Sequence, residues 1–303
     1  MTLVITNCTN RKRKPIPHAL HMSDLAAAPL PTLAAAWAER LEAAPERFPA
    51  TSIYGGRAFQ EAVTVATATK ARLLVISAGL GLIDASTDAP PYACTVLVGA
   101  ADSVAGKVTG PYGAAHWWTA LRAVSPFARP LAEFVAGEDG PILVALSDAY
   151  LALIADELLA LPPAKLDTVR IFTRTPSARV APGLRHLIMP YDDRLDGPDS
   201  DIPGTRSDFA GRALRHFVAL GSAGTAVQDA AAVETALAAW RLPARHDRAR
   251  HDDAALLDLM RMHWLRAGGS SSKLLRIFRD DLGIACEQSR FAGLARQIRG
   301  EQA

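Results

Sequence analysis

Short apolar runs alternate with longer Ala-rich segments over the first three quarters of this 303-residue chain. The runs are bounded by polar or turn residues, which is typical of buried strands in a mostly parallel sheet. We expect strands at residues 3–6, 73–77, 142–146, 168–173 and 186–189. The segments between them have helical spacing, and we expect helices at residues 32–43, 58–70, 114–124, 148–161 and 208–220. Strands that alternate with helices predict an α/β fold, a mostly parallel sheet flanked by helices.

The pattern changes near Gly221, where a stretch of small residues can end the domain. We therefore expect an α/β domain at residues 1–221 and a helical C-terminal module, with its linker, at residues 222–303. Helical patterns continue at residues 229–240, 254–265, 273–279 and 287–298, and residues 241–251 have almost no apolar content. The last three patterns are short and are separated by turns, so the module resembles a helix-turn-helix.

Charge and cysteine content exclude several classes of protein. The chain has 33 Lys and Arg against 31 Asp and Glu, a net charge of +2, which excludes a wholly basic surface. The charge is uneven, because residues 241–303 hold 12 Lys and Arg against 8 Asp and Glu, so this part carries +4 and the rest −2. The three cysteines form no CxxC pair and the histidines no HExxH motif, so we expect no metal and no cofactor. The chain also has no signal-peptide pattern and no long uncharged apolar stretch, so we expect a cytoplasmic protein without membrane association.

A polar and basic segment follows the first expected strand directly. Asn7, Thr9 and Asn10 offer amides and a hydroxyl, and Arg11 and Lys12 follow them. Ligands of open α/β sheets bind outside the carboxyl ends of strands, so this position favours a site. The polar groups can contact the edge of a base and the cations a phosphate. A solvated basic loop is the alternative.

A double glycine leads into the second expected helix. Gly55 and Gly56 stand between Tyr54 and Arg57, and glycines at a helix start allow close approach of an anion to backbone N–H groups. The segment does not match a Walker A loop or GxGxxG. A plain tight turn is equally compatible with it.

Three further segments place polar residues at strand ends or in long loops. The strand at residues 73–77 ends at Ser77 and enters a turn with Gly79. Ser147 follows the strand at residues 142–146, where Ser147-Asp148 can equally serve as a helix N-cap, as can Ser207-Asp208 at a later helix start. A long loop from Tyr191 to Phe209 is rich in carboxylates and arginines, which suits the rim of a pocket.

Two of these segments resemble motifs of the YaaA-like superfamily. Cys8-Thr9-Asn10-Arg11-Lys12 is similar to its early C-[ST]-x-[RK]-K motif, and LVISAGLGLI at residues 74–83 is similar to its later L-[IV]-[IVL]-S-A-x-x-G-L-[IL] motif. The resemblance covers roughly residues 1–220. It implies a link to DNA and modified bases, including bacterial phage-defence DNA glycosylases, and a layered core distantly similar to uracil-DNA glycosylases.

On this resemblance we expect hydrolysis of the N-glycosidic bond of a modified base in double-stranded DNA. Such an enzyme extracts the nucleotide from the stack and stabilises an oxocarbenium-like transition state. The catalytic candidates are Asn7 and Asn10, to position water, and Asp84 and Asp192, as the acid/base carboxylate. The substrate-binding candidates are Thr9, Tyr54, Gly55, Gly56, Arg57, Ser77, Gly79, Tyr92, Ser147 and Arg194, with Tyr54 or Tyr92 stacking on the base. The DNA-binding candidates are Arg11, Lys12, Lys273, Arg276 and Arg279, and Arg57 is a further candidate phosphate clamp.

The residues leave two other functions open. The motifs of uracil-DNA glycosylases that activate water or intercalate, GQDPYH and HPSPLS, are absent. A noncatalytic DNA-binding or stress protein would use the same pocket for recognition only. An enzyme that processes free nucleosides would act on small molecules and not on duplex DNA.

Overall fold

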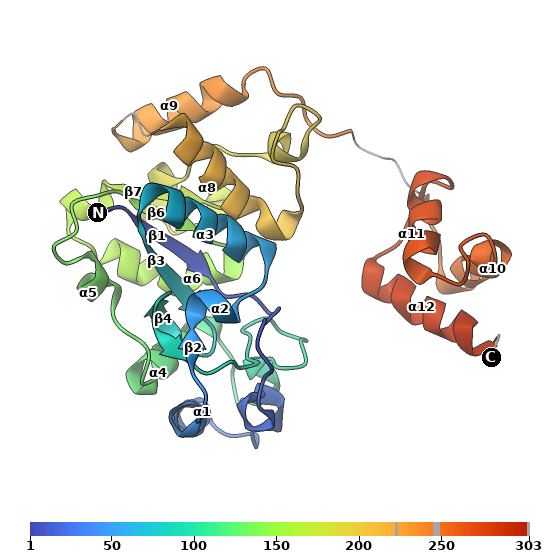
Figure 1. The fold of residues 1–303 in the computed structure, drawn as a ribbon, viewed down its shortest axis with the longest axis horizontal. Helices are drawn as coiled ribbons and strands as arrows, with labels where there is room; N and C mark the ends of the chain where they lie inside the picture. The colour runs from blue at the N-terminus through green and yellow to red at the C-terminus, as the bar shows by residue number, and fades with distance from the viewer. Residues whose placement is uncertain (222–223, 245–248, 302–303) are drawn as a thin grey trace. The chain divides into compact units, whose positions relative to one another are not determined.

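The computed structural model describes residues 1–221, 224–244 and 249–301 (Figure 1). It divides into two units, Met1–Pro243 and Ala244–Ala303. Among the described residues, no helix combines the length and apolar character that crossing a membrane requires.

A five-stranded sheet forms the centre of the first unit. In spatial order its strands are β4 (Gly81–Asp84), β3 (Arg72–Ser77), β1 (Leu3–Asn7), β6 (Ile142–Ala145) and β7 (Val169–Phe172). All neighbouring pairs are parallel except β3 and β4. Because β1, β6 and β7 are in register, with Thr6 opposite Ala145 and Ala145 opposite Phe172, the residues that follow these strands emerge at one edge of the sheet.

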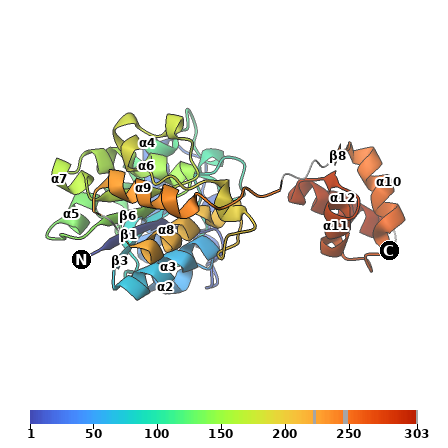
Figure 2. The same cartoon turned by 90° about the horizontal axis from the view of Figure 1, so that it is seen from above.

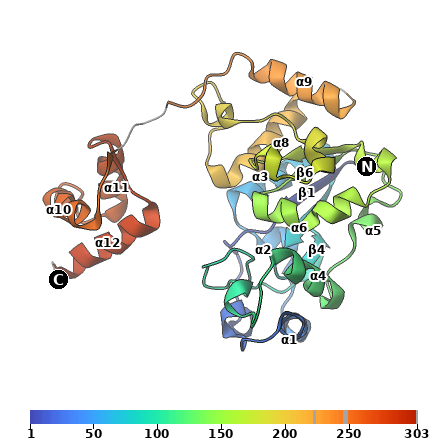
Figure 3. The ribbon, with the colours of Figure 1, turned by 180° about the vertical axis from the view of Figure 1, so that it is seen from behind.

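Helices cover both faces of this sheet. Helices α3 (Arg57–Thr69) and α8 (Phe209–Leu220) pack on one face, and α4 (Ala114–Val124) and α6 (Asp148–Leu159) pack on the other, as Figures 2 and 3 show. Helix α1 (Leu30–Ala43) packs against α4. Each strand is therefore buried on both faces, which explains why its sequence is a continuous apolar run and not an alternating one.

Short elements complete the first unit. They are β2 (Phe48–Pro49) paired with β5 (Asp88–Ala89), α2 (Ala50–Ile53), α5 (Leu131–Val135), α7 (Pro163–Leu166) and α9 (Ala226–Leu237). Short 3₁₀ helices lie at His18–Leu20, Met22–Asp24, Val104–Gly106, Ser177–Arg179, Pro182–Leu187, Asp193–Asp196 and Arg206–Asp208.

The expected helices are all present, with ends that differ by at most three residues, and four of the five expected strands are confirmed. The strand expected at residues 186–189 is wrong, because Pro182–Leu187 is a 3₁₀ helix and only Ile188 bridges to Ile171 of β7. The expected caps are also not made as predicted. Ser147 stands at the N-cap of α6 and Asp208 at that of α8, yet neither side chain accepts a capping hydrogen bond there.

The turn after β3 leads into β4, a strand that is not among the five expected ones. Gly81, with φ of 88°, begins β4, which returns antiparallel along β3. This hairpin brings Asp84 back opposite Leu74, near the start of β3.

The boundary between the units lies later than we expected. We placed it after residue 221, but α9 belongs to the first unit, where Val233 and Leu237 are fully buried in its core. The Arg170 Nε atom of β7 lies 2.6 Å from Asp229 Oδ2 of α9, and both side chains are almost inaccessible to solvent. Burial of the apolar face of α9 holds the helix on the α/β core, and the ion pair leaves neither buried charge without a counter-ion.

Three helices and a two-stranded sheet form the second unit. They are α10 (Asp253–Trp264), α11 (Ser271–Asp280), α12 (Gln288–Glu301), and β8 (Ala249–Arg250) paired in parallel with β9 (Ile284–Ala285). The unit has its own core, which includes Met260, Trp264, Phe278, Phe291 and Ile298. The structure thus shows a helical C-terminal unit with a core separate from that of the α/β unit.

Candidate active site at the carboxyl ends of β1, β6 and β7

The order of the strands creates a crevice between β1 and β6. The chain proceeds from β1 to β3 on one side of β1 and later places β6 on the other side. At such a switch point the connections leave the two neighbouring strands in opposite directions, so the carboxyl ends of open α/β sheets commonly bind ligands there. Asn7 ends β1 and Ser147 follows β6, so both lie at this crevice.

A cavity of about 370 Å³ opens at this point. Its size lies in the range of small-molecule sites, about 300–1,000 Å³. Its polar lining comes from the ends of β1, β6 and β7 and from the segment that leads into α8. The polar residues of this lining are Asn7, Ser147, Asp148, Arg174, Thr175, Arg179, Arg206 and Ser207.

The carboxamide of Asn7 is held in one orientation. Its Nδ2 donates to Cys8 O at 2.9 Å, and its Oδ1 accepts from the backbone N–H of Ser147 at 3.3 Å. A primary amide has two N–H donors and two acceptor lone pairs, so one donor and one acceptor position remain for a ligand or a water molecule. Asn7 can therefore orient a small polar group in the cavity.

Asp148 is the carboxylate that lines this cavity. It is the first residue of α6, and its Oδ2 accepts from Arg179 Nη1 at 3.0 Å. Both side chains are more than half exposed, so water reaches the pair. A carboxylate at a helix N-terminus is stabilised by the partial positive charge of the first-turn N–H groups. Asp148 can thus present negative charge to a bound molecule.

Two other arginines of the cavity differ in how they are held. Arg174 is paired with Asp193 and with Asp196, and its guanidinium carbon lies 5.4 Å from the centre of the Phe209 ring. Arg206 is exposed, and no carboxylate of the described residues forms an ion pair with it. Arg206 is therefore available to an anionic ligand, while Arg174 is fixed in the wall.

A buried polar cluster lies next to this site, where the two motif segments meet. The Lys12 ammonium donates to Thr9 O at 2.6 Å and lies 4.6 Å from the centre of the Tyr92 ring and 5.2 Å from that of Tyr54. The Tyr92 hydroxyl is 2.5 Å from Ser77 Oγ and 3.1 Å from the Tyr54 hydroxyl. The cluster therefore links the loop after β1 to the β3–β4 hairpin.

Burial shifts the pKa values of this cluster. It lowers the pKa of Lys12 below the ordinary value of 10.5, with Cys8, Cys94 and Asp102 opposing the shift. It raises the pKa of Tyr54 and of Tyr92, because a phenolate is disfavoured away from water.

The cluster corrects three of the expected roles. Tyr54 and Tyr92 are fully buried, so neither ring has a free face on which a base could stack. Lys12 is turned inward, over these two rings, and does not lie among the residues of the cavity. Ser77 is fully buried and accepts from the backbone N–H of Leu80 at 2.9 Å, so it fixes the hairpin turn.

The glycines serve close packing. A Cβ atom on Gly56 would lie 2.5 Å from Thr9 Cγ2, and one on Gly79 would lie 2.6 Å from Tyr92 Cε2. One on Gly55 would lie 3.1 Å from Arg13 Cγ. The Gly56 N–H donates to Thr9 Oγ1 at 3.2 Å. Thr9, Gly55, Gly56 and Gly79 therefore pack the loop after β1 closely against its neighbours, and none of them lines the cavity.

Arg57 connects α3 to the loop before α8. Its Nη2 donates to Pro203 O at 2.5 Å, and its Nε lies 3.5 Å from Asp208 and 3.7 Å from Glu61. These contacts make Arg57 a structural link between the two segments, and it does not lie among the residues that line the cavity, so its expected role as a phosphate clamp stays a prediction. Asn10 and Arg11, by contrast, are exposed on the loop after β1.

The two expected acid/base carboxylates lie outside the cavity. Asp84 pairs with Arg72 at 2.6 Å and accepts from the N–H and hydroxyl of Ser86, and these contacts lower its pKa despite partial burial. The β3–β4 hairpin has carried it away from Asn7. Asp192 caps a 3₁₀ turn and pairs with Arg194 at 2.9 Å, which lowers its pKa, and Arg194 donates to Leu237 O of α9.

Of the expected site residues, the cavity brings together Asn7 and Ser147. Sequence reasoning did not select Asp148, Arg174, Arg179 or Arg206. Asp148 and Arg174 each follow a predicted strand closely, so the strand-end rule that selected Asn7 could also have found them. Arg206 was not selected by itself, but it lies in the long loop from Tyr191 to Phe209 that was expected to form the rim of a pocket, and Arg206 and Ser207 of this loop line the cavity.

No protein-family model, no curated protein and no solved structure matches this chain significantly. The likeness to the YaaA-like superfamily thus rests on residues 8–12 and 74–83. Among the residues that the structure describes, no group of three or more His, Cys, Asp or Glu side chains is arranged to hold a metal ion.

Proposed function

We propose that the protein is a DNA glycosylase that removes a modified base from duplex DNA, in defence against phage. The observation that supports this most is the cavity of about 370 Å³ at the β1–β6 crevice, which an oriented amide, a carboxylate and an exposed arginine line together. The finer fold assignment, a core similar to uracil-DNA glycosylases, belongs to the same proposal. Its support is the parallel strands whose carboxyl ends form the site.

In this proposal different residues of the cavity orient the attacking water and stabilise the transition state. The free donor and acceptor positions of Asn7 orient the attacking water, and Ser147 holds Asn7 in place. The Asp148 carboxylate stabilises the oxocarbenium character that develops at C1′ and accepts the proton of the water as the C–N bond breaks. The departing base takes up a proton from solvent or from the site. Asp148 thus takes the acid/base role for which the sequence offered Asp84 or Asp192 as alternatives.

In this proposal the arginines of the site bind the phosphates of the DNA backbone. Arg206 pairs with the phosphate that flanks the extracted nucleotide, and Arg11 holds a neighbouring one. Lys273, Arg276 and Arg279 of α11 give the C-terminal unit its contact with DNA, in the manner of a helix-turn-helix. Several separate positive side chains are what a protein needs to bind the phosphates that flank an extracted base.

The test is base release from defined duplexes. The full chain is incubated with a panel of duplexes that each contain one modified base, such as uracil, 5-hydroxymethylcytosine or N6-methyladenine, and abasic sites are detected by alkaline strand cleavage. We expect cleavage of at least one duplex. Asn7→Ala should lower the single-turnover rate about 10²-fold, because an oriented polar contact in the transition state is lost. Asp148→Asn should lower it about 10²- to 10⁴-fold.

Asp192→Asn is the matched control. It also removes a carboxylate paired with an arginine, but outside the cavity, so it should leave the rate unchanged. No abasic sites on any duplex, with binding retained, would favour the noncatalytic DNA-binding protein instead. Base release from free nucleosides but never from duplex DNA would favour the nucleoside-processing enzyme.

A further inference from the structure

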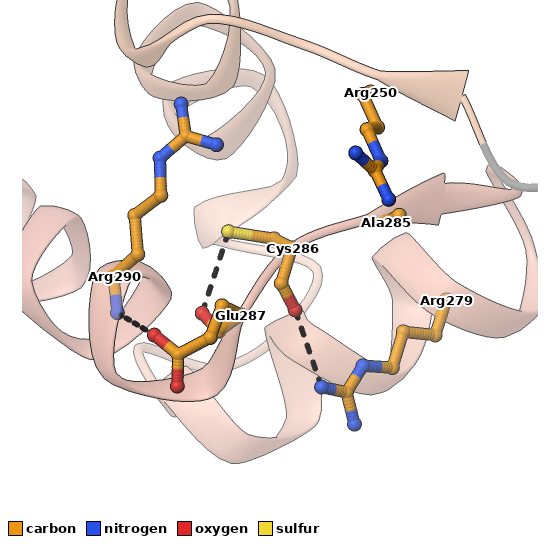
Figure 4. A pocket seen from close by; sticks show the side chains of 6 residues that line it. All are labelled: Arg250, Arg279, Ala285, Cys286, Glu287 and Arg290. Carbon is orange, nitrogen blue, oxygen red and sulfur yellow. Dashed lines mark hydrogen bonds between the residues drawn. The ribbon is translucent and has the colours of Figure 1, made fainter. Parts of the chain in front are cut away.

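Three arginines meet at a second cavity, which lies within the C-terminal unit. It has a volume of about 400 Å³ and is lined by Arg250, Arg279, Ala285, Cys286, Glu287 and Arg290 (Figure 4). The arginines come from β8, from α11 and from the first turn of α12. Elements that are far apart in the sequence therefore place three guanidinium groups around Cys286.

Two of these arginines are held in position by the unit itself. Arg279 Nη2 donates to Cys286 O at 3.2 Å. Arg290 donates to Asp253 Oδ1 at 2.7 Å through Nε and to His251 O at 3.1 Å through Nη2. A guanidinium has five N–H donors, so one that the protein holds in place can also donate to a ligand. Their positions are thus fixed before any ligand binds, which lowers the entropic cost of binding.

The charge of the cavity favours an anion. Arg250 is exposed, and no described carboxylate forms an ion pair with it. Glu287 is the one carboxylate among the lining residues, and Asp253, which is not a lining residue, pairs with Arg290, so three guanidinium groups face two carboxylates. Burial raises the pKa of the Cys286 thiol, so it stays protonated and uncharged at neutral pH. Because guanidinium groups match phosphate oxygens in geometry as well as charge, phosphate is the anion that this arrangement suits.

The positive surface continues beyond the cavity along α11. Arg276 is exposed and lies three residues before Arg279, so the two are neighbours on the helix surface. Lys273 is exposed and lies three residues before Arg276. A row of cations that leads away from a phosphate site suits a polymer with several phosphates better than a single small anion.

We propose that this cavity binds one backbone phosphate of duplex DNA, with Arg250, Arg279 and Arg290 as its ligands. The choice of DNA as the ligand rests on the proposed function. The site lies in a different unit from the β1–β6 crevice and does not require base release. It anchors the C-terminal unit on DNA independently of sequence, because a phosphate contact carries no base information.

Salt-dependent binding of the full chain to an unmodified duplex tests this proposal. The affinity of the wild type, of Arg250→Gln and of Arg250→Gln with Arg279→Gln is measured by fluorescence anisotropy between about 50 and 200 mM salt. We expect the double variant to lose about tenfold in affinity and the slope of log K against log [salt] to fall by about one, because one phosphate contact is lost. Arg250→Gln alone should give part of both effects. Arg250 is exposed, so this variant tests the site without disturbing the core.

Arg266→Gln is the matched control in the same unit. Arg266 pairs with Asp281 outside the cavity, so its loss should leave the salt slope at the wild-type value. A double variant with the wild-type affinity and slope would overturn the proposal, as would tighter binding of an RNA duplex through the same residues. Base release at saturating protein is measured separately. If the double variant binds the unmodified duplex more weakly but still releases the base at saturating protein, the phosphate site is supported. If no base is released while the wild type still binds the duplex through these arginines, only the proposed function fails.

Discussion

The ion pair between Arg170 and Asp229 makes a sharp prediction about how α9 is attached. The side chains are 3% and 0% exposed, and Arg170 also donates to Gly224 O, Asp167 O and Val169 O. Replacing Asp229 with Ala leaves the guanidinium buried without its counter-ion. Loss of one partner of a buried pair costs about 3–5 kcal/mol. Because the three carbonyl contacts remain, we expect the lower end, about 3 kcal/mol.

The assay is equilibrium unfolding of the full chain in urea, followed by tryptophan fluorescence. Four of the five tryptophans lie in the first unit, so this signal reports mainly on that unit. The variant Asp229→Ala should shift the transition to lower urea with little change in slope. The double variant Arg170→Met with Asp229→Ala should recover most of the loss, because replacing both ions removes the uncompensated charge.

Asp199→Ala is the control, because Asp199 pairs with Arg241 at the surface, where screening makes such pairs weak. It should change the unfolding transition far less than Asp229→Ala. The reasoning would be refuted if Asp229→Ala unfolded at the wild-type urea concentration. Such a result would mean that α9 is held on the α/β core by its apolar face, with Val233 and Leu237, and not by this pair.

Three further predictions concern the surroundings of the active site. Gly79→Ala should destabilise the first unit by about 1–3 kcal/mol in urea unfolding, because the new Cβ would lie 2.6 Å from the buried Tyr92 ring. Asp84→Asn should lower the free energy of unfolding by about 1 kcal/mol at neutral pH, after allowance for its partial exposure. Since Arg72 and Ser86 lower the pKa of Asp84, the wild type should lose this advantage as the pH falls below 3.8 through the lowered pKa. Because burial lowers the pKa of Lys12, the stability of the wild type relative to Lys12→Met should rise with pH between that lowered pKa and 10.5.

Each of these has a matched control. Gly106→Ala should be tolerated, because no described atom lies within 4 Å of the position that its Cβ would take and its φ is not positive. Asp88→Asn removes an exposed carboxylate next to the same hairpin and should not alter the acid transition. Lys14→Met should leave the rise of stability with pH intact. Equal pH profiles for Lys12→Met and wild type would show that Lys12 is not held away from water.

Some residues of the candidate site can be predicted from the rule that ligands bind outside the carboxyl ends of strands. Asn7 and Ser147 follow strands that the apolar runs predicted, and parallel strands in register bring their ends together, so both were found from sequence. Asp84 comes seven residues after Ser77, the end of the expected strand at residues 73–77, but Gly81 with its positive φ starts an antiparallel strand that carries Asp84 back along β3, opposite Leu74. One turn therefore moved a predicted carboxylate out of the site.

The amino-acid sequence alone determined the α/β class, the order of the helices and the helical C-terminal part, because hydrophobic periodicity is a local property of the chain. Near-neutral charge excluded a wholly basic surface, and the concentration of cations after residue 240 was visible without a structure. Only the tertiary structure decided which polar groups share the β1–β6 crevice, that Tyr54 and Tyr92 are buried, and that Arg250, Arg279 and Arg290 line one cavity. These facts depend on contacts between residues far apart in the chain. Strand pairing and packing are determined by several segments together, whereas periodicity is a property of a single segment.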